Sequence, residues 1–173
     1  MARHIELNPV SHMTVNTVGP PGQRTFYLQG TKGADTVSLI IEKQQAAMLA
    51  SSFDSLLGEL ARKRSGESRD PQEQVWMDLR LREPLEPLFR VGKMEMGYSE
   101  SMDRVVLVAY ELVDESVEEP NAVSFWLSRD QVETLIPHIE EVVEAGRPIC
   151  GNCGQPIDPD GHFCPKRNGG HRS

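Results

Sequence analysis

The pattern of hydrophobic and polar residues divides the first part of the chain into strand-like and helix-like stretches. Three stretches rich in β-branched or aromatic residues predict β-strands. These stretches are 13–18, 24–29 and 36–41. The connections 19–22 and 30–33 contain glycine or proline and suit tight turns. From Lys43 to about Arg64 the apolar residues recur every three or four positions, which predicts an amphipathic helix.

The same succession follows in the second part of the chain. Three further stretches predict strands at 89–97, 104–112 and 122–127. A second amphipathic helix is expected to begin near Ser128, which can form a capping box with Gln131, and to end at Gly146. Between the two parts, 63–73 is polar, lacks periodicity and predicts an exposed loop.

The two parts also resemble one another in sequence. Val37–Leu49 aligns with Val123–Leu135 at a constant separation of 86 residues, with matching Val, Ser, Gln and Leu. The alignment predicts a duplicated strand–strand–strand–helix unit with halves at about 10–64 and 86–146, although two amphipathic units can also match by chance. We therefore expect an α+β domain over 1–147, with antiparallel sheet or sheets backed by two long helices. A cleft between the halves would be the natural place for a ligand.

Length and charge restrict the class of protein. A chain of 173 residues usually forms one domain, with room for a small appendage. Its net charge of −8 argues against nucleic-acid binding, which requires a basic surface. No run of about 20 apolar residues is present, and the first residues do not have the pattern of a signal peptide. We expect a cytoplasmic protein that does not bind membranes.

The one pattern that carries chemistry lies in the tail, 148–173, which contains all three cysteines. Cys150-x-x-Cys153-Gly is typical of a zinc knuckle, and the turn at 158–161 would return the chain toward Cys164. Three thiolates and one imidazole would complete a tetrahedral Zn²⁺ site with no position open for substrate. The tail is therefore predicted to hold a structural zinc ion in a small zinc-ribbon-like knuckle.

Two histidines compete for the fourth position of this site. His162 lies two residues before Cys164, so that on an extended chain both side chains point to one face. His171 follows a Gly-Gly pair and could also reach the metal. We favour His162 and keep His171 as the alternative. A redox Cys-x-x-Cys would be expected to open a helix, whereas Gly and Pro follow Cys153 here.

No common catalytic or nucleotide-binding motif is present elsewhere in the sequence. The sequence therefore favours a non-enzymatic binding or adaptor protein that engages a protein partner. The alternative is an enzyme that acts on a small phosphorylated or nucleotide-like ligand in the cleft between the halves. Its basic residues would be Arg24, Arg90 and Arg104.

Several short motifs resemble those of a known protein family. They are Thr17–Gly19, Gly22–Gln29, Phe89–Gly92, Ala145–Pro148, Asp158–His162, Cys164–Pro165 and Asn168–Gly169. On these motifs the chain resembles domain-of-unknown-function family 3090, an uncharacterised bacterial family, over nearly its whole length.

The resemblance implies a repeat protein with a zinc-ribbon-like end. It carries the metal ligands over to Cys150, Cys153, His162 and Cys164. The family's ending differs after Asn168-Gly169, which leaves His171 outside the match. Relatives are often encoded near phosphoinositide-kinase-like and histidine-phosphatase-like proteins, which implies a shared pathway without indicating a reaction.

Overall fold

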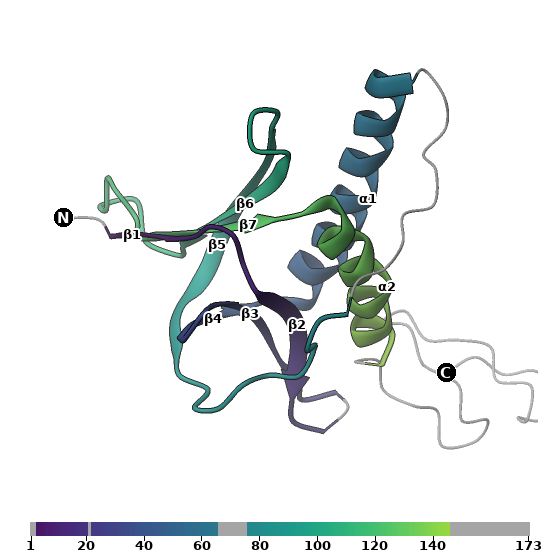
Figure 1. Ribbon diagram of the computed structural model, residues 1–173. Helices are drawn as coiled ribbons and strands as arrows, with labels where there is room; N and C mark the ends of the chain where they lie inside the picture. The colour runs from purple at the N-terminus through teal and green to yellow at the C-terminus, as the bar shows by residue number, and fades with distance from the viewer. Residues whose placement is uncertain (1–2, 21, 66–75, 146–173) are drawn as a thin grey trace, which may run out of the picture.

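The computed structural model describes residues 3–20, 22–65 and 76–145 (Figure 1). These residues form one seven-stranded sheet and two helices. In chain order the elements are β1 (His4–Leu7), β2 (His12–Val18), β3 (Thr25–Lys32), β4 (Asp35–Ile41), α1 (Lys43–Ser65), β5 (Pro87–Ser99), β6 (Arg104–Glu111), β7 (Ala122–Leu127) and α2 (Arg129–Ala145).

The mixed α and β content agrees with the sequence prediction, which located β2 to β7 and both helices. The prediction missed β1, a four-residue strand that precedes the first predicted half. A strand this short gives little periodic signal, and only Leu7 in it is fully buried. β1 forms because it pairs with β7, where Leu7 lies opposite Phe125.

The expectation of an antiparallel sheet was wrong for two pairs of neighbouring strands. The strand order is β1-β7-β6-β5-β4-β3-β2, and both the β1–β7 and the β4–β5 pairs are parallel. The remaining neighbours are antiparallel. Parallel neighbours require a long connection, and α1 supplies it between β4 and β5. The sheet is therefore mixed, and β1 joins the first half to the second.

The sheet curls so that its two edge strands come together. β1 and β2 stand at opposite ends of the strand order, yet they are consecutive in the chain. In the connection between them, the Val10 amide donates to the Trp126 carbonyl (2.9 Å) and the Ser11 amide donates to the Thr31 carbonyl (2.7 Å). One short segment thus bridges both edges. Figure 1 shows the resulting two layers, with both helices on the same side of them.

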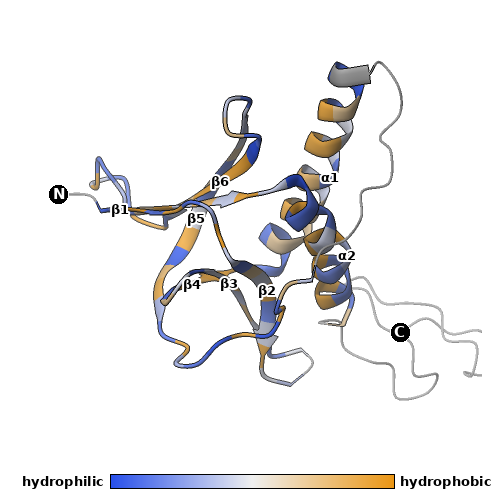
Figure 2. Cartoon of the chain, viewed as in Figure 1, coloured by the Kyte–Doolittle hydropathy of each residue, from blue (hydrophilic) through white to orange (hydrophobic). Residues whose placement is uncertain are grey.

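The interior of this curled sheet is packed by apolar side chains from both layers. Figure 2 shows apolar residues alternating with polar ones along the strands and running along both helices. Phe125 of β7 is completely buried and lies against Gly30 of β3, from the opposite layer. A Cβ atom at Gly30 would be 2.6 Å from two ring atoms of Phe125. The two layers therefore approach closely only because residue 30 has no side chain.

A glutamine fastens the start of α1 to the second half of the chain. The side-chain oxygen of Gln45 accepts from the Glu42 amide (2.7 Å), as in a capping box. The amide nitrogen of the same side chain donates to the Val91 carbonyl in β5 (3.2 Å). Gln45 thus caps its helix and ties that helix to a strand of the other half.

A second glutamine makes the corresponding contacts at the start of α2. The side-chain oxygen of Gln131 accepts from the Ser128 amide (2.9 Å), and its nitrogen donates to the Val10 carbonyl (3.0 Å). The predicted capping box of Ser128 and Gln131 is confirmed, because Ser128 Oγ also accepts from the Gln131 amide (3.1 Å). Gln45 and Gln131 are one of the residue pairs that the internal alignment matched.

We expect Gly30→Ala to lower the free energy of unfolding by about 1–3 kcal/mol, because the added methyl group must displace the Phe125 ring. Equilibrium denaturation by urea measures this change. Gly97→Ala is the matched control: it also lies in a strand, but the nearest atom to its Cβ, in Val106, is 3.6 Å away. An equal loss in both variants would contradict close packing of the two layers at Gly30.

Candidate functional site

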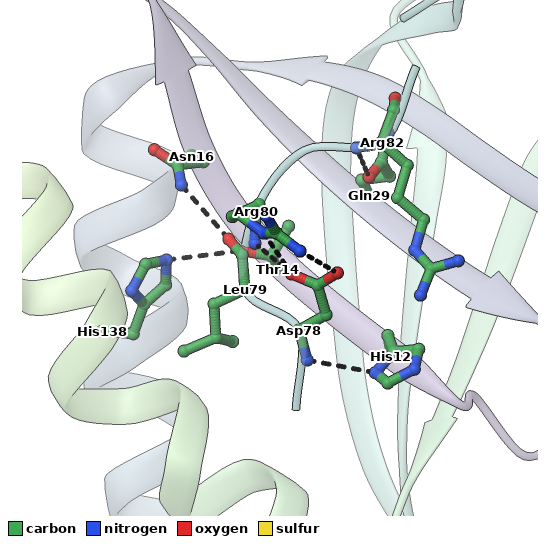
Figure 3. Close-up of polar contacts among 9 residues, drawn as sticks. All are labelled: His12, Thr14, Asn16, Gln29, Asp78, Leu79, Arg80, Arg82 and His138. Atoms are coloured by element: carbon green, nitrogen blue, oxygen red, sulfur yellow. Dashed lines mark hydrogen bonds and ion pairs between the residues drawn. The ribbon is translucent and has the colours of Figure 1, made fainter. Parts of the chain in front are cut away.

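An extended segment, residues 76–82, crosses the outer face of β2 and β3 close to α2 (Figure 3). We call this segment the strap. It lies between α1 and β5 in the chain and forms neither helix nor strand. The side chains that hold it come from β2 and β3, and the groups that they contact are mostly main-chain atoms of the strap. These contacts bring together residues that lie more than 50 positions apart in the chain.

The side chains of β2 bind the middle of the strap. Thr14 Oγ1 donates to the Leu79 carbonyl (2.7 Å), and Asn16 Nδ2 donates to the same oxygen (3.2 Å). The Asp78 amide donates to Nδ1 of His12 (3.2 Å). His12, Thr14 and Asn16 alternate along the strand and so point to one face of the sheet. Together they contact two successive residues of the strap, Asp78 and Leu79.

Gln29 of β3 binds the end of the strap through two points. Its side-chain oxygen accepts from the Arg82 amide (2.8 Å), and its nitrogen donates to the Arg82 carbonyl (3.2 Å). The nitrogen also donates to Ser38 Oγ (2.9 Å). The Gln29 side chain is buried, and these contacts satisfy both ends of its amide. The contact reproduces the donor and acceptor pair that a neighbouring strand would offer.

His138 of α2 supports the same region from the helix side. Its Nε2 lies 3.0 Å from the Val15 carbonyl and 3.3 Å from Thr14 Oγ1. A carbonyl only accepts, so Nε2 carries the proton and donates to it. Burial lowers the pKa of His138, and the contact with Val15 opposes that effect. A neutral imidazole is therefore the form that the folded protein favours.

Two side chains of the strap, those of Trp76 and Arg80, are exposed to solvent. Trp76 is 80% exposed, and its ring meets the His12 ring edge-on. Arg80 pairs with Asp78 at the surface (3.0 Å), and this hydrogen-bonded pairing lowers the pKa of Asp78 to about 2. The strap is thus held by hydrogen bonds to its main chain and by apolar side chains, because Met77 is buried in the core and Leu79 packs against it.

A hollow of about 440 Å³ lies between α1 and α2, where the sequence analysis expected a ligand cleft. It is lined by small and apolar residues and by the carboxylates of Asp54, Glu140 and Glu144. Within the described part of the chain no basic residue lines this hollow, and three carboxylates disfavour a phosphorylated ligand. The place that the alternative prediction required for such a ligand is therefore acidic.

The structure does not bring the three arginines of that alternative together. Arg24 donates to Thr17 Oγ1 (2.8 Å) beside the β2–β3 turn. Arg90 in β5 pairs with Glu42 at the start of α1 (2.7 Å). Arg104 begins β6 and pairs in register with Ser99, at the far end of β5 from Arg90. They do not form a common anion site.

The predicted zinc ligands Cys150, Cys153, His162 and Cys164, and the alternative ligand His171, lie outside the described residues. Among the described residues, no group of three or more His, Cys, Asp or Glu side chains could hold a metal ion. No helix in the described ranges is both long and apolar enough to cross a membrane.

Sequence reasoning missed the strap and its contacts. Residues 76–82 show no helical or strand periodicity, and they lie beyond the exposed loop that the sequence predicted at 63–73. The usable signal was the alternation of His12, Thr14 and Asn16 on a strand whose other face is apolar. Polar residues that alternate in this way usually face solvent, so the pattern alone did not predict that a segment covers them.

The described part of the chain is thus a mixed α and β domain whose outer polar face binds an extended segment of its own main chain. A family profile described as "Protein of unknown function (DUF3090)" matches residues 5–164. The chain belongs to this family, as the resemblance indicated. No curated protein matches the chain, and no solved structure matches it.

We expect Gln29→Leu to release the strap, because the variant loses both contacts with Arg82 and the bond to Ser38. If these bonds contribute about 1–2 kcal/mol, trypsin should cut the Arg80–Leu81 bond about tenfold faster. Limited proteolysis with mass spectrometry measures the rate at that bond. Gln44→Leu makes the same substitution at an exposed position of α1 and should leave the rate unchanged. An unchanged rate in Gln29→Leu would show that other contacts hold the strap.

The pKa of His138 predicts a pH dependence of stability. Burial lowers this pKa below its ordinary value of 6.5, so the unfolded chain binds a proton before the folded chain does. The contribution is complete above about pH 6.5 and is lost as the pH falls toward the folded value. His138→Gln keeps a donor near Val15 but does not titrate, and its urea midpoint should fall less between pH 7.5 and pH 5 than that of the native chain. Equal falls would exclude this role.

Proposed function

We propose that this chain is a non-enzymatic binding protein whose described domain presents a surface to a protein partner and whose tail carries a structural zinc ion. The observation that supports binding is the capture of the strap. Side chains of Thr14, Asn16 and Gln29 hold an extended main chain through its amide and carbonyl groups. This is the chemistry by which binding proteins recognise extended peptides.

The side chains near the strap that could act as acids or bases are also engaged in holding the strap or the strand beneath it. His12 accepts from the Asp78 amide, and His138 donates to the Val15 carbonyl. Asp78 is paired with Arg80 at the surface. Each of these groups is engaged in holding the chain in place, which supports a binding role over a catalytic one for this face.

The zinc proposal rests on the spacing of the tail residues. Cys150, Cys153 and Cys164 would supply thiolates, with His162 as the favoured fourth ligand and His171 as its alternative. Thiolate ligation of this kind fits a reducing compartment, so the proposal places the protein in the cytoplasm. A tail this short has little core of its own, and the metal would supply most of its folding free energy.

We also propose that the two halves arose by duplication. Their element order is the same, with three strands followed by a helix in β2-β3-β4-α1 and again in β5-β6-β7-α2. Gln45 and Gln131 support the proposal further, because each caps its helix and then bonds to a main-chain carbonyl of the other half.

The test uses the full chain, purified without a histidine tag, beside Cys153→Ser, His162→Ala and His171→Ala. We expect about one zinc ion per chain in the native protein and in His171→Ala, and loss of zinc in the other two variants. Elemental analysis measures the metal. The same proteins are then used to capture partners from extracts of the native host.

A partner retained by the native chain and by His171→Ala, but lost with the zinc, would support both parts of the proposal. No zinc in the native chain would contradict the metal site. Loss of zinc only in His171→Ala would instead make His171 the fourth ligand. A native chain that captures no protein would contradict the binding function.

A further inference from the structure

We infer that the tail, 148–173, packs against the outer side of β5, β6 and β7, with Phe163 as its anchor. The surface that receives it is called the open face, and its residues are Val106, Val108, Tyr110 and Trp126. The tail itself lies outside the described residues. The inference rests on the proposed zinc tail and adds to it a docking site within the same chain.

The open face is the solvent-facing side of the second sheet layer. Val105 and Leu107 of β6 are at most 1% exposed, whereas Val106 and Val108, which alternate with them, are partly exposed. Trp126 of β7 pairs with Val106 and is partly exposed as well. The exposed side of an antiparallel sheet normally carries polar side chains, so a contiguous group of two valines and an indole ring marks a contact surface.

The strap covers the equivalent surface in the first half of the chain. There Ser38 pairs with Gln29, which in turn pairs with Thr14. These three side chains are at most 4% exposed, and both Gln29 and Thr14 bond to the strap. In the second half Ser124, which the internal alignment matches to Ser38, pairs with Val108. Val108 therefore holds the place of Gln29.

The two surfaces also lie on the same side of their sheet layers. Ser124 and Phe125 are neighbours in β7, so their side chains point to opposite sides of the sheet. Phe125 points into the interior, against Gly30, which leaves Ser124 on the outer side. His4 of β1 covers that position, with its Nε2 2.5 Å from Ser124 Oγ. The open face is therefore the counterpart of the outer face under the strap and not of the apolar interior.

The order of segments in the chain indicates what covers the open face. The strap follows α1, and the tail follows α2. At the separation of 86 residues that relates Ser38 to Ser124, the strap corresponds to 162–168 of the tail. Phe163 then takes the place of Met77, the side chain of the strap that is buried in the core. The repeated unit would thus comprise three strands, a helix and a covering segment.

The proposed zinc site leaves Phe163 in need of a contact. His162 and Cys164 flank Phe163, and on an extended chain both point to one side, toward the metal. The Phe163 ring then points away from the metal, and a tail this short has no core of its own to bury it. The open face offers apolar and aromatic side chains that remove such a ring from water.

Carboxylates stand at both ends of the middle row of the open face. Glu6 of β1 and Glu95 of β5 belong to this row, and both are exposed. Lys93 of β5 lies on the same side but is held over an aromatic ring of β6 (4.9 Å). In the tail, Lys166 and Arg167 closely follow the anchor. Docking of the anchor therefore brings two cations toward two carboxylates, which favours this occupant.

The tail is long enough to reach the open face. α2 ends at Ala145, and Phe163 follows about 18 residues later. A chain of this length spans up to about 60 Å. This reach exceeds the diameter of about 40 Å that is expected of a domain of this size.

The test measures how fast a protease specific for arginine cuts full-length variants after Arg167, with mass spectrometry to identify the cut. The tail variant is Phe163→Ala, and the surface variant is Val108→Lys, which places a charge in the open face. Val117→Lys is the matched control, because Val117 is an exposed valine (42%) in the connection between β6 and β7, outside the open face.

We expect Phe163→Ala and Val108→Lys each to be cut about tenfold faster than the native chain, and Val117→Lys to be cut at the native rate. The double variant should be cut no faster than the faster single variant, because both changes remove the same contact. Equal rates in the native chain and Phe163→Ala would overturn the inference. A native rate that rises on dilution would show that the tail packs against a second copy, and would overturn it as well.

The tryptophan indole signals in an amide NMR spectrum give a second measurement, which does not depend on the folding of Val108→Lys. The chain has two tryptophans, and Trp76→Phe assigns their signals. Phe163→Ala should shift the Trp126 signal, because it removes a neighbouring aromatic ring. The Trp76 signal should stay in place, since Trp76 lies against His12. An unchanged Trp126 signal would contradict the docking.

Elemental analysis of zinc in the same proteins separates this inference from the proposed function. Phe163→Ala should retain about one zinc ion per chain, because it keeps all the proposed ligands. If the native chain holds zinc but every variant is cut at the native rate, the metal site stands and the docking is wrong. If the native chain holds no zinc but Phe163→Ala and Val108→Lys are cut faster, the tail docks and the metal proposal is wrong.

Discussion

The close approach of the two sheet layers at Gly30 is the contact on which the rest of this structure depends. Phe125 occupies the space that a side chain at residue 30 would need, and Leu7 of β1 adjoins the same place. This packing lets the sheet curl until its edge strands are joined by the short segment that contains Val10. Because the interior is filled in this way, the opposite faces of β2 and β3 are free to carry polar residues.

The outer face of the curled sheet shows how buried polar groups can be satisfied by a segment without regular structure. Thr14 and Gln29 are both almost fully buried, and each bonds to a main-chain carbonyl of the strap. A buried hydroxyl or amide without a partner would cost about 1–3 kcal/mol. The strap therefore completes the domain by supplying these buried groups with hydrogen-bond partners.

Hydrogen bonds from a few side chains connect the two halves, in addition to the strand pairing of the sheet. Gln45 and Gln131 each cap a helix and reach across to the other half. The surroundings of the two helices nevertheless differ, since the strap lies near α2 on the outer face of β2 and β3, and a methionine-lined groove lies between α1 and the apolar face of β5.

The sequence by itself determined the strands β2 to β7, both helices and the cap at Ser128, because local periodicity and capping chemistry act over a few residues. It also identified the family and the matching glutamines. Only the tertiary structure decided the parallel β1–β7 and β4–β5 pairs, the contact of Gly30 with Phe125, and the strap on Thr14 and Gln29. These features join residues far apart in the chain, and no local pattern records which distant strand or segment will cover a given face.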